Sequence, residues 1–341
     1  MLCLSSCGGA PPKQTYLYVG QVIPPAGTPI SWQGAVAQFK VQDDGTLLAV
    51  DLPIPNSFTP FYFAVAPSNQ LVLASDGREI QEFQIQSDGI LTGETPLVPI
   101  GGSLAFAPNG QFAVVLDTPN QTLTSYSVAR DGVLTLVDTV SAGDSYLVSP
   151  TQTIVDPSGK FAYINDSNGN TILGYSLSPT GSLAPIGSFP IGAVQPLQLT
   201  YSPKGLLYIA NGSPGTLASY SINHANGTIT PVGTPVIYHP SGLFWMSFDP
   251  RGRYAYTGGD LEIDQFTVDA STGTLTPNGV LPLSQEVRAG SVDPSGRFLF
   301  ATLNDGTVSQ FKIDSNGTLI PNGSVSLETG SLGQTLSFAQ R

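Results

Sequence analysis

The sequence predicts an all-β protein, a seven-bladed β-propeller with four short antiparallel strands in each blade. A Gly-x-(Leu/Ile) marker recurs seven times, and its successive glycines are 44, 43, 49, 46, 46 and 44 residues apart. A second marker, Pro-x-(Gly/Asn), precedes the β-rich runs. The chain has 38 Gly, 29 Pro and only 11% charged residues, which is typical of a turn-rich fold. The glycines of the first marker are Gly45, Gly89, Gly132, Gly181, Gly227, Gly273 and Gly317.

The repeat units follow one another along the chain. The first unit is degenerate and begins at Pro12, where PKQTYLYVG aligns with PSGKFAYIN of a later unit. In residues 161–164 and 173–177 every second side chain is large and apolar, which predicts strands packed between neighbouring blades. Asn-Gly and Asp-Gly pairs supply the positive φ that hairpin turns need. The later units begin at Pro67, Pro108, Pro157, Pro203, Pro250 and Pro294.

The two ends of the repeat array predict how the ring closes. Residues 16–19 read as the second strand of a unit, whereas residues 335–339 read as a first strand. We therefore expect the C-terminal strand to complete the first blade, which removes the open edges of the ring. Residues 12–341 are predicted to form one domain, preceded by a separate segment, residues 1–11.

The N-terminal segment reads MLCLSSCGGAPP and resembles the lipobox of bacterial lipoproteins. In that interpretation Cys7 is lipidated, Cys3 is removed, and the domain is anchored outside the cytoplasm, in the periplasm or at the cell surface. The alternative is a disordered tail with two incidental cysteines.

Composition excludes several classes of partner. The formal net charge is −12 with only 12 Lys plus Arg, so no basic stripe is available to neutralise the phosphates of a nucleic acid. No run of about 20 apolar residues exists, so no transmembrane span is expected. We expect a monomer.

The stretch PSGKFAYINDSNGNTILGYSL, followed by TGSLAPIG, resembles the seven-bladed propeller lactonase family typified by bacterial 6-phosphogluconolactonase. It also resembles the YVTN-type repeats of surface propellers. The lactonase resemblance covers nearly the whole chain at the level of the repeat. It implies hydrolysis of a lactone at one mouth of the central channel, and the expected partner is a small-molecule lactone or carbohydrate.

The resemblance also implies site residues, although several family landmarks are replaced here. Asp166 is retained after the second strand of the fourth unit, and Asp260 replaces the acid of a second landmark. These carboxylates would orient water or a metal, and Arg288 would stabilise the oxyanion. His239 lies near the same mouth, and Trp245 stands where the family has the His of an Arg-His pair.

A pattern of carboxylates can be seen without the family. Asp76, Asp117 and Asp166 follow the repeat proline by nine residues, Asp260 follows by ten, and Asp305 lies one place further along. They either cap local turns or form an acidic rim that binds a divalent cation, Ca²⁺ or Mg²⁺, or a polyhydroxy ligand. Trp245 is expected to line the channel mouth beside this rim.

Two classes of function therefore stay open. The first is a lactone hydrolase of the 6-phosphogluconolactonase type with a degenerate site. The second is a non-catalytic surface propeller that binds a glycan, a peptide or a surface protein.

Overall fold

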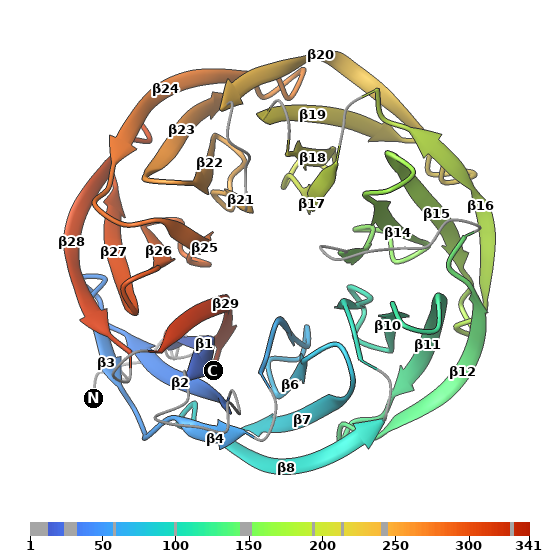
Figure 1. Cartoon of the computed structure of the whole chain (residues 1–341), viewed down its shortest axis with the longest axis horizontal. Helices are drawn as coiled ribbons and strands as arrows, with labels where there is room; N and C mark the ends of the chain where they lie inside the picture. The colour runs from blue at the N-terminus through green and yellow to red at the C-terminus, as the bar shows by residue number, and fades with distance from the viewer. Residues whose placement is uncertain are drawn as a thin grey trace, which may run out of the picture.

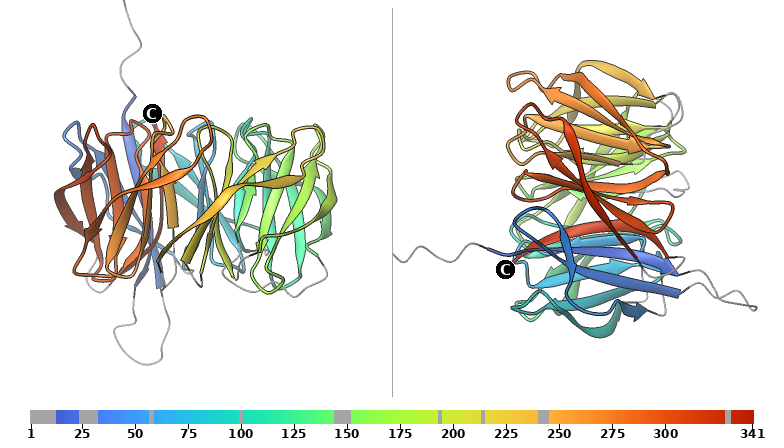
Figure 2. Two further views of the ribbon diagram at one scale, coloured as in Figure 1. Left: turned by 90° about the horizontal axis from the view of Figure 1, so that it is seen from above. Right: turned by 90° about the vertical axis from the view of Figure 1, so that its left-hand side faces the viewer.

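The structure is a computed structural model that describes residues 13–23, 33–56, 59–98, 101–143, 152–192, 195–212, 215–239, 245–327 and 331–341. These residues form 29 β-strands in seven sheets, and none of them is helical. The sheets stand around a central axis, with the outermost strands on the circumference (Figure 1). From the side, the strands cross a flat disc between its two faces (Figure 2). The predicted seven-bladed β-propeller is confirmed.

Each blade has four antiparallel strand positions ordered from the axis to the circumference, and in the first blade the outer position is divided between two short strands. The innermost strands are β29 (Leu332–Gln340), β5 (Tyr62–Val65), β9 (Leu104–Phe106), β13 (Thr153–Val155), β17 (Pro196–Tyr201), β21 (Trp245–Phe248) and β25 (Val287–Val292). The second strands are β1 (Thr15–Ile23), β6 (Leu71–Ser75), β10 (Phe112–Asp117), β14 (Phe161–Asp166), β18 (Leu207–Asn211), β22 (Tyr254–Gly259) and β26 (Phe298–Leu303). The third strands are β2 (Gln33–Val41), β7 (Ile80–Ile85), β11 (Thr122–Val128), β15 (Thr171–Leu177), β19 (Gly215–Ile222), β23 (Glu262–Val268) and β27 (Thr307–Ile313). The outer strands are β3 (Leu47–Ala49) with β4 (Ile54–Asn56), β8 (Leu91–Val98), β12 (Leu134–Ser141), β16 (Leu183–Pro190), β20 (Ile229–His239), β24 (Leu275–Pro282) and β28 (Leu319–Ser326).

The ring closes through the C-terminal strand, as the sequence predicts. β29 pairs antiparallel with β1, so that Val19 lies opposite Leu336. Beyond the end of the ladder, Gln14 N–H donates to the carbonyl oxygen of Arg341 at 2.7 Å, and Arg341 N–H donates back at 2.9 Å. The first blade is thus built from both ends of the chain, which leaves no innermost strand missing from the ring.

Buried apolar side chains form seven clusters, each shared by two neighbouring blades. In β14, Phe161 and Tyr163 belong to the cluster shared with the fifth blade. Ala162 and Ile164 belong to the cluster shared with the third blade. The predicted alternation therefore buries both faces of the blade, because each sheet is packed between two others.

The Gly-x-(Leu/Ile) turns are docking points between blades. A tyrosine in the second strand of one blade donates its hydroxyl hydrogen bond to the glycine carbonyl of the next blade. These bonds are Tyr18 to Gly89 at 2.7 Å, Tyr163 to Gly227 at 2.7 Å, Tyr256 to Gly317 at 2.8 Å, and Tyr208 to Gly273. The repeated glycine marker therefore reports a contact between blades as well as a turn.

The face of the disc at which the innermost strands end holds carboxylates that the sequence analysis does not single out. Asp156, Asp249 and Asp293 precede the repeat proline and are fully buried or nearly so. One oxygen of Asp156 accepts the backbone N–H groups of Lys160 and Phe161, both at 2.8 Å. These carboxylates fix the turn between the innermost and second strands, which is a structural task.

Candidate functional site

The innermost strands begin, and the second strands end, at the same face of the disc, which we call the mouth face. A cavity of about 500 Å³ opens there on the axis of the ring. All seven innermost strands or the residues just before them contribute to its lining. Among the described residues that line it are Tyr62, Ser103, Gln152, Gln198, Trp245, Arg288 and Gln334.

Arg288 supplies the cationic group of this cavity. It lies near the start of β25 and is half-buried. Its Nε donates to Oδ1 of Asn304 at 2.8 Å, and its Nη1 lies 3.5 Å from Oε1 of Gln334. Within the described residues no ion pair joins Arg288 to a carboxylate. The charge therefore stays available to a ligand, because amides orient a guanidinium without neutralising it.

The chain segment that carries Arg288 is fixed from two sides. Asn304 N–H donates to the carbonyl oxygen of Glu286 at 2.9 Å, and Val287 N–H donates to the carbonyl oxygen of Asp260 at 2.9 Å. Asp260 has φ of +46°, in the left-handed region that non-glycine residues rarely adopt. The turn of the sixth blade thus holds the start of the last blade through its backbone.

Side chains also join neighbouring innermost strands around the channel. Leu199 N–H donates to Oε1 of Gln152 at 2.6 Å, and Val292 N–H donates to Oγ of Ser247 at 3.0 Å. Each bond runs from one blade to the next. Side-chain hydrogen bonds therefore help to hold neighbouring strands of the cavity wall together at these two places.

Trp245 forms part of this wall and is almost fully buried. A Cβ placed on Gly258 would lie 2.5 Å from Cε2 of its indole, and one placed on Gly290 would lie 2.6 Å from Cη2. The two glycines therefore make room for the ring. The indole Nε1, together with Thr153 Oγ1 and Gln198 Oε1, has no hydrogen-bond partner among the described residues.

The predicted rim carboxylates lie on the mouth face, at the turns that follow the second strands. Four of them accept backbone N–H groups of their own turns, as the capping interpretation expects. These bonds run to Asp76 from Arg78 at 2.7 Å, to Asp117 from Asn120 at 3.0 Å, to Asp166 from Gly169 at 2.9 Å, and to Asp305 from Thr307 at 3.0 Å. None of the five lines the channel cavity.

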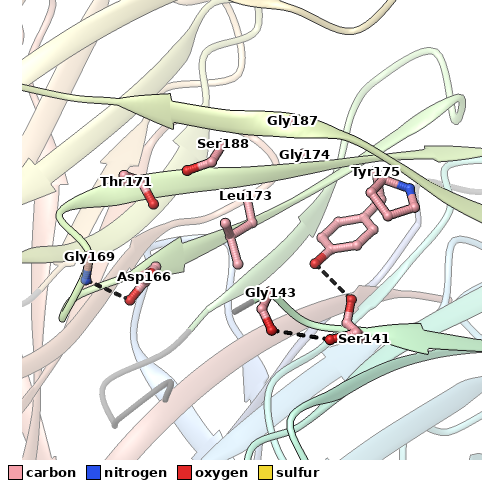
Figure 3. Close-up of a pocket in the computed structure, with 11 residues that line it drawn as sticks. Ser141, Gly143, Asp166, Gly169, Thr171, Leu173, Gly174, Tyr175, Gly187 and Ser188 are labelled. Atoms are coloured by element: carbon pink, nitrogen blue, oxygen red, sulfur yellow. Dashed lines mark hydrogen bonds between the residues drawn. The ribbon is translucent and has the colours of Figure 1, made fainter. Parts of the chain in front are cut away.

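Asp166 lines a second cavity instead, about 610 Å³ in volume, between the third and fourth blades. Asp166 lies at one end of it and Tyr175 at the other, with Leu173 between them (Figure 3). The hydroxyl of Tyr175 donates to the carbonyl oxygen of Ser141 at 3.1 Å and joins the two blades. The structure therefore separates Asp166 from Arg288, the two residues that the resemblance places in one site.

The remaining candidates are only partly described. His239 is the last residue of β20, opposite Gly215, and its side chain lies outside the description. Cys7 lies outside the described residues. The described residues contain no group of three or more His, Cys, Asp or Glu side chains placed to hold a metal ion. The described part of the chain also contains no helix that could span a membrane.

Several cavity residues were not singled out from the sequence, although a signal for them exists. Counting five residues back from the repeat proline gives a position that lines the cavity in six units. The residues at this position are Tyr62, Ser103, Gln152, Gln198, Trp245 and Ala289. Asn304 has no such signal, because its contact with Arg288 depends on how two strands pair.

The cavity combines one cation with amides, hydroxyls and an indole, and its described lining residues include no carboxylate, imidazole or thiol. Such a surface suits a small hydroxylated ligand that carries a carbonyl oxygen or a negative charge, because each of its polar groups finds a partner.

Comparison with protein families supports the predicted resemblance. Residues 103–244 match the family model described as "Lactonase, 7-bladed beta-propeller". This stretch runs from the third to the fifth blade and is less than half of the chain. No curated protein sequence matches the chain.

Solved structures match over nearly the whole chain. A Lactobacillus plantarum protein has 19% identity and a TM-score of 0.77, covering 95% of this chain and 99% of its own. A putative 6-phosphogluconolactonase from Bacteroides uniformis has 18% identity and a TM-score of 0.76, covering 96% and 99%. The periplasmic gluconolactonase of Pseudomonas aeruginosa has 17% identity and a TM-score of 0.75, covering 95% and 99%. At these identities the likeness shows a shared fold.

Proposed function

We propose that this protein, whose residues 103–244 match the seven-bladed lactonase model, hydrolyses a sugar lactone at its channel mouth. The observation that carries the proposal is the guanidinium of Arg288, held by Asn304 in a cavity of amides and hydroxyls. Similar structures named gluconolactonases support a sugar lactone as the substrate class.

The chemistry assigns Arg288 a definite role. Water adds to the lactone carbonyl carbon, negative charge develops on the carbonyl oxygen, and the ring C–O bond then breaks to give a hydroxy acid. A guanidinium N–H within reach of that oxygen stabilises the charge as it forms. In this proposal the amides of Gln152, Gln198 and Gln334, which line the cavity, bind the hydroxyl groups of the sugar.

A second candidate function is binding of a polyhydroxy ligand without hydrolysis. The absence of a carboxylate, imidazole or thiol from the described lining residues favours it, because no such side chain is in place to activate water. Asp166, Asp260 and His239 stay predictions as catalytic residues, and so does a Ca²⁺ or Mg²⁺ site. A lipid anchor at Cys7 and a place outside the cytoplasm are also predictions, carried by the LSSC motif.

The decisive experiment measures acid release from a panel of aldonolactones by the full chain and by Arg288→Met. Arg251→Gln serves as the matched control, because Arg251 is exposed in a turn on the opposite face. We expect Arg288→Met to lower kcat about 10²- to 10³-fold, as loss of an oxyanion donor does elsewhere, and the control to retain activity.

The other outcomes separate the candidates. Turnover that survives in Arg288→Met would contradict the role given to Arg288. No turnover above buffer, together with saturable calorimetric binding of an aldonate that Arg288→Met abolishes, would favour the binding protein over the hydrolase.

A further inference from the structure

We infer that Asn304 is the positioning residue of the site, a two-ended amide that holds Arg288 and keeps it apart from the carboxylate of Glu286. Asn304 directly follows β26, and its side chain contacts Arg288 in the neighbouring innermost strand β25 and Glu286 just before that strand. Its Oδ1 accepts from Nε of Arg288 at 2.8 Å, and its Nδ2 donates to Oε2 of Glu286 at 3.0 Å.

The amide of Asn304 satisfies both partners. A guanidinium has no acceptor and a carboxylate has no donor, so the side chain between them must offer one acceptor and one donor. The backbone fixes the same geometry, because Asn304 N–H also donates to the carbonyl oxygen of Glu286 at 2.9 Å. The orientation of the amide is thus determined by its neighbours.

We call the two hydrogen bonds from the Asn304 side chain, to Arg288 and to Glu286, the clamp. The clamp leaves one edge of the guanidinium available to a ligand. Nε is occupied by Asn304, whereas Nη1 has only the 3.5 Å contact with Gln334, and Nη2 has no hydrogen bond within the described residues. Both nitrogens belong to a residue that lines the cavity. This edge presents parallel N–H groups, which match the two oxygens of a carboxylate or phosphate.

Asn304 also preserves the charge of the site. Glu286 and Arg288 are separated by one residue, and both bind the same amide. Without that amide, the carboxylate would pair directly with the guanidinium and would neutralise the cation that a ligand needs. If the proposed hydrolysis holds, Asn304→Ala would therefore weaken oxyanion stabilisation by Arg288, although Asn304 itself does not contact the substrate. This kinetic consequence rests on the proposed function.

The clamp is tested first without any ligand, by the NMR signal of the Arg288 Nε–H, assigned through its loss in Arg288→Lys. Glu286→Gln keeps an acceptor for Asn304 Nδ2, so its Arg288 Nε–H should exchange slowly with water, as in the wild type. The double variant Asn304→Ala/Glu286→Gln differs only at Asn304, and its signal should lose this protection. Equal protection in the two variants would overturn the clamp.

The second role of Asn304, which is to keep Glu286 from pairing with Arg288, is called its spacer role. It is tested by calorimetric binding of gluconate to the full chain. We expect Asn304→Ala to bind gluconate at least about tenfold more weakly than the wild type does. In this variant Glu286 would pair with Arg288, and the charge-assisted contact between Arg288 and gluconate would be lost. Adding Glu286→Gln should restore much of the affinity, since no carboxylate then neutralises Arg288. Asn278→Ala is the matched control and should bind normally, because among the described residues the Asn278 amide bonds the carbonyl oxygen of Asn316 and lies outside the cavity.

The results distinguish this inference from the proposed function. Wild-type protein that hydrolyses no lactone, but shows the expected Nε–H protection and gluconate affinities, would reject the hydrolase and retain the clamp. Absence of gluconate binding by the wild type, or weak binding by Asn304→Ala that Glu286→Gln does not restore, would overturn the spacer role. A thermal melt of each variant would confirm that it is folded.

Discussion

The hydroxyl of Tyr256 donates a hydrogen bond of 2.8 Å to the carbonyl oxygen of Gly317, which lies in the next blade. The tyrosine ring is fully buried, and burial raises the pKa of its hydroxyl well above the ordinary range. The contact recurs between three other pairs of blades. Blades of this protein are therefore joined by specific polar bonds within their apolar clusters.

Tyr256→Phe should lower the free energy of unfolding by about 1–3 kcal/mol, because the buried carbonyl of Gly317 loses its partner. Tyr126→Phe is the matched control, since the buried hydroxyl of Tyr126 has no partner among the described residues. We expect that change to be neutral or stabilising. Urea denaturation would measure both, and equal losses in the two variants would contradict the role of the hydrogen bond.

Gly227→Ala should cost more stability than Gly233→Ala. Both glycines have positive φ, +75° and +66°, so alanine is strained at either position by about 1–2 kcal/mol. At Gly227 a Cβ would also lie 2.5 Å from the ring of Phe161, whereas at Gly233 no atom of the described residues lies within 4 Å. Overpacking adds about 1–3 kcal/mol at Gly227 alone. Thermal melts with equal shifts would show that the aromatic contact is unimportant.

Glu82→Gln should make stability less dependent on pH. Burial raises the pKa of the Glu82 carboxyl, and the negative charge of Asp131 raises it further. A hydrogen bond from Gln84 lowers this pKa, but the net shift is upward. The folded state thus keeps its proton to a higher pH than the unfolded state, and the free energy of unfolding falls as pH rises through this interval. The variant should be more stable than wild type at neutral pH, with the gain shrinking below the ordinary glutamate range. Urea titrations at pH 4 and pH 8 would test this, and a gain that is the same at both would refute it.

Removal of residues 328–341 should abolish the folded monomer. β1 would lose its partner β29, and the cluster that contains Leu17, Val19 and Phe300 would lose the packing of Leu336 and Phe338. The resulting open edge favours aggregation. Size-exclusion chromatography would detect the loss, and a synthetic peptide of residues 331–341 should restore a soluble species. An unchanged monomer with an unchanged melting temperature would contradict the closure.

The architecture of this protein could be predicted from its sequence alone. The spacing of the repeated glycines from Gly45 to Gly317 and the alternation in residues 161–164 predict seven blades. The second-strand pattern of residues 16–19 and the first-strand pattern of residues 335–339 predict how the ring closes. They do so because hairpin turns, two-sided burial and strand pairing each impose a local, repeated requirement on residue type.

Which polar residues contact one another depends on the tertiary structure. Asp166 and Asp260 follow the repeat prolines like the other rim carboxylates, yet Asp166 lines a cavity between blades and Asp260 holds Val287 through its backbone carbonyl. Arg288 and Trp245 line the channel as expected, but their setting depends on Asn304, Gly258 and Gly290. Such contacts join residues in different strands, so they depend on strand register and on the angle between blades. Neither is encoded in the spacing within one repeat.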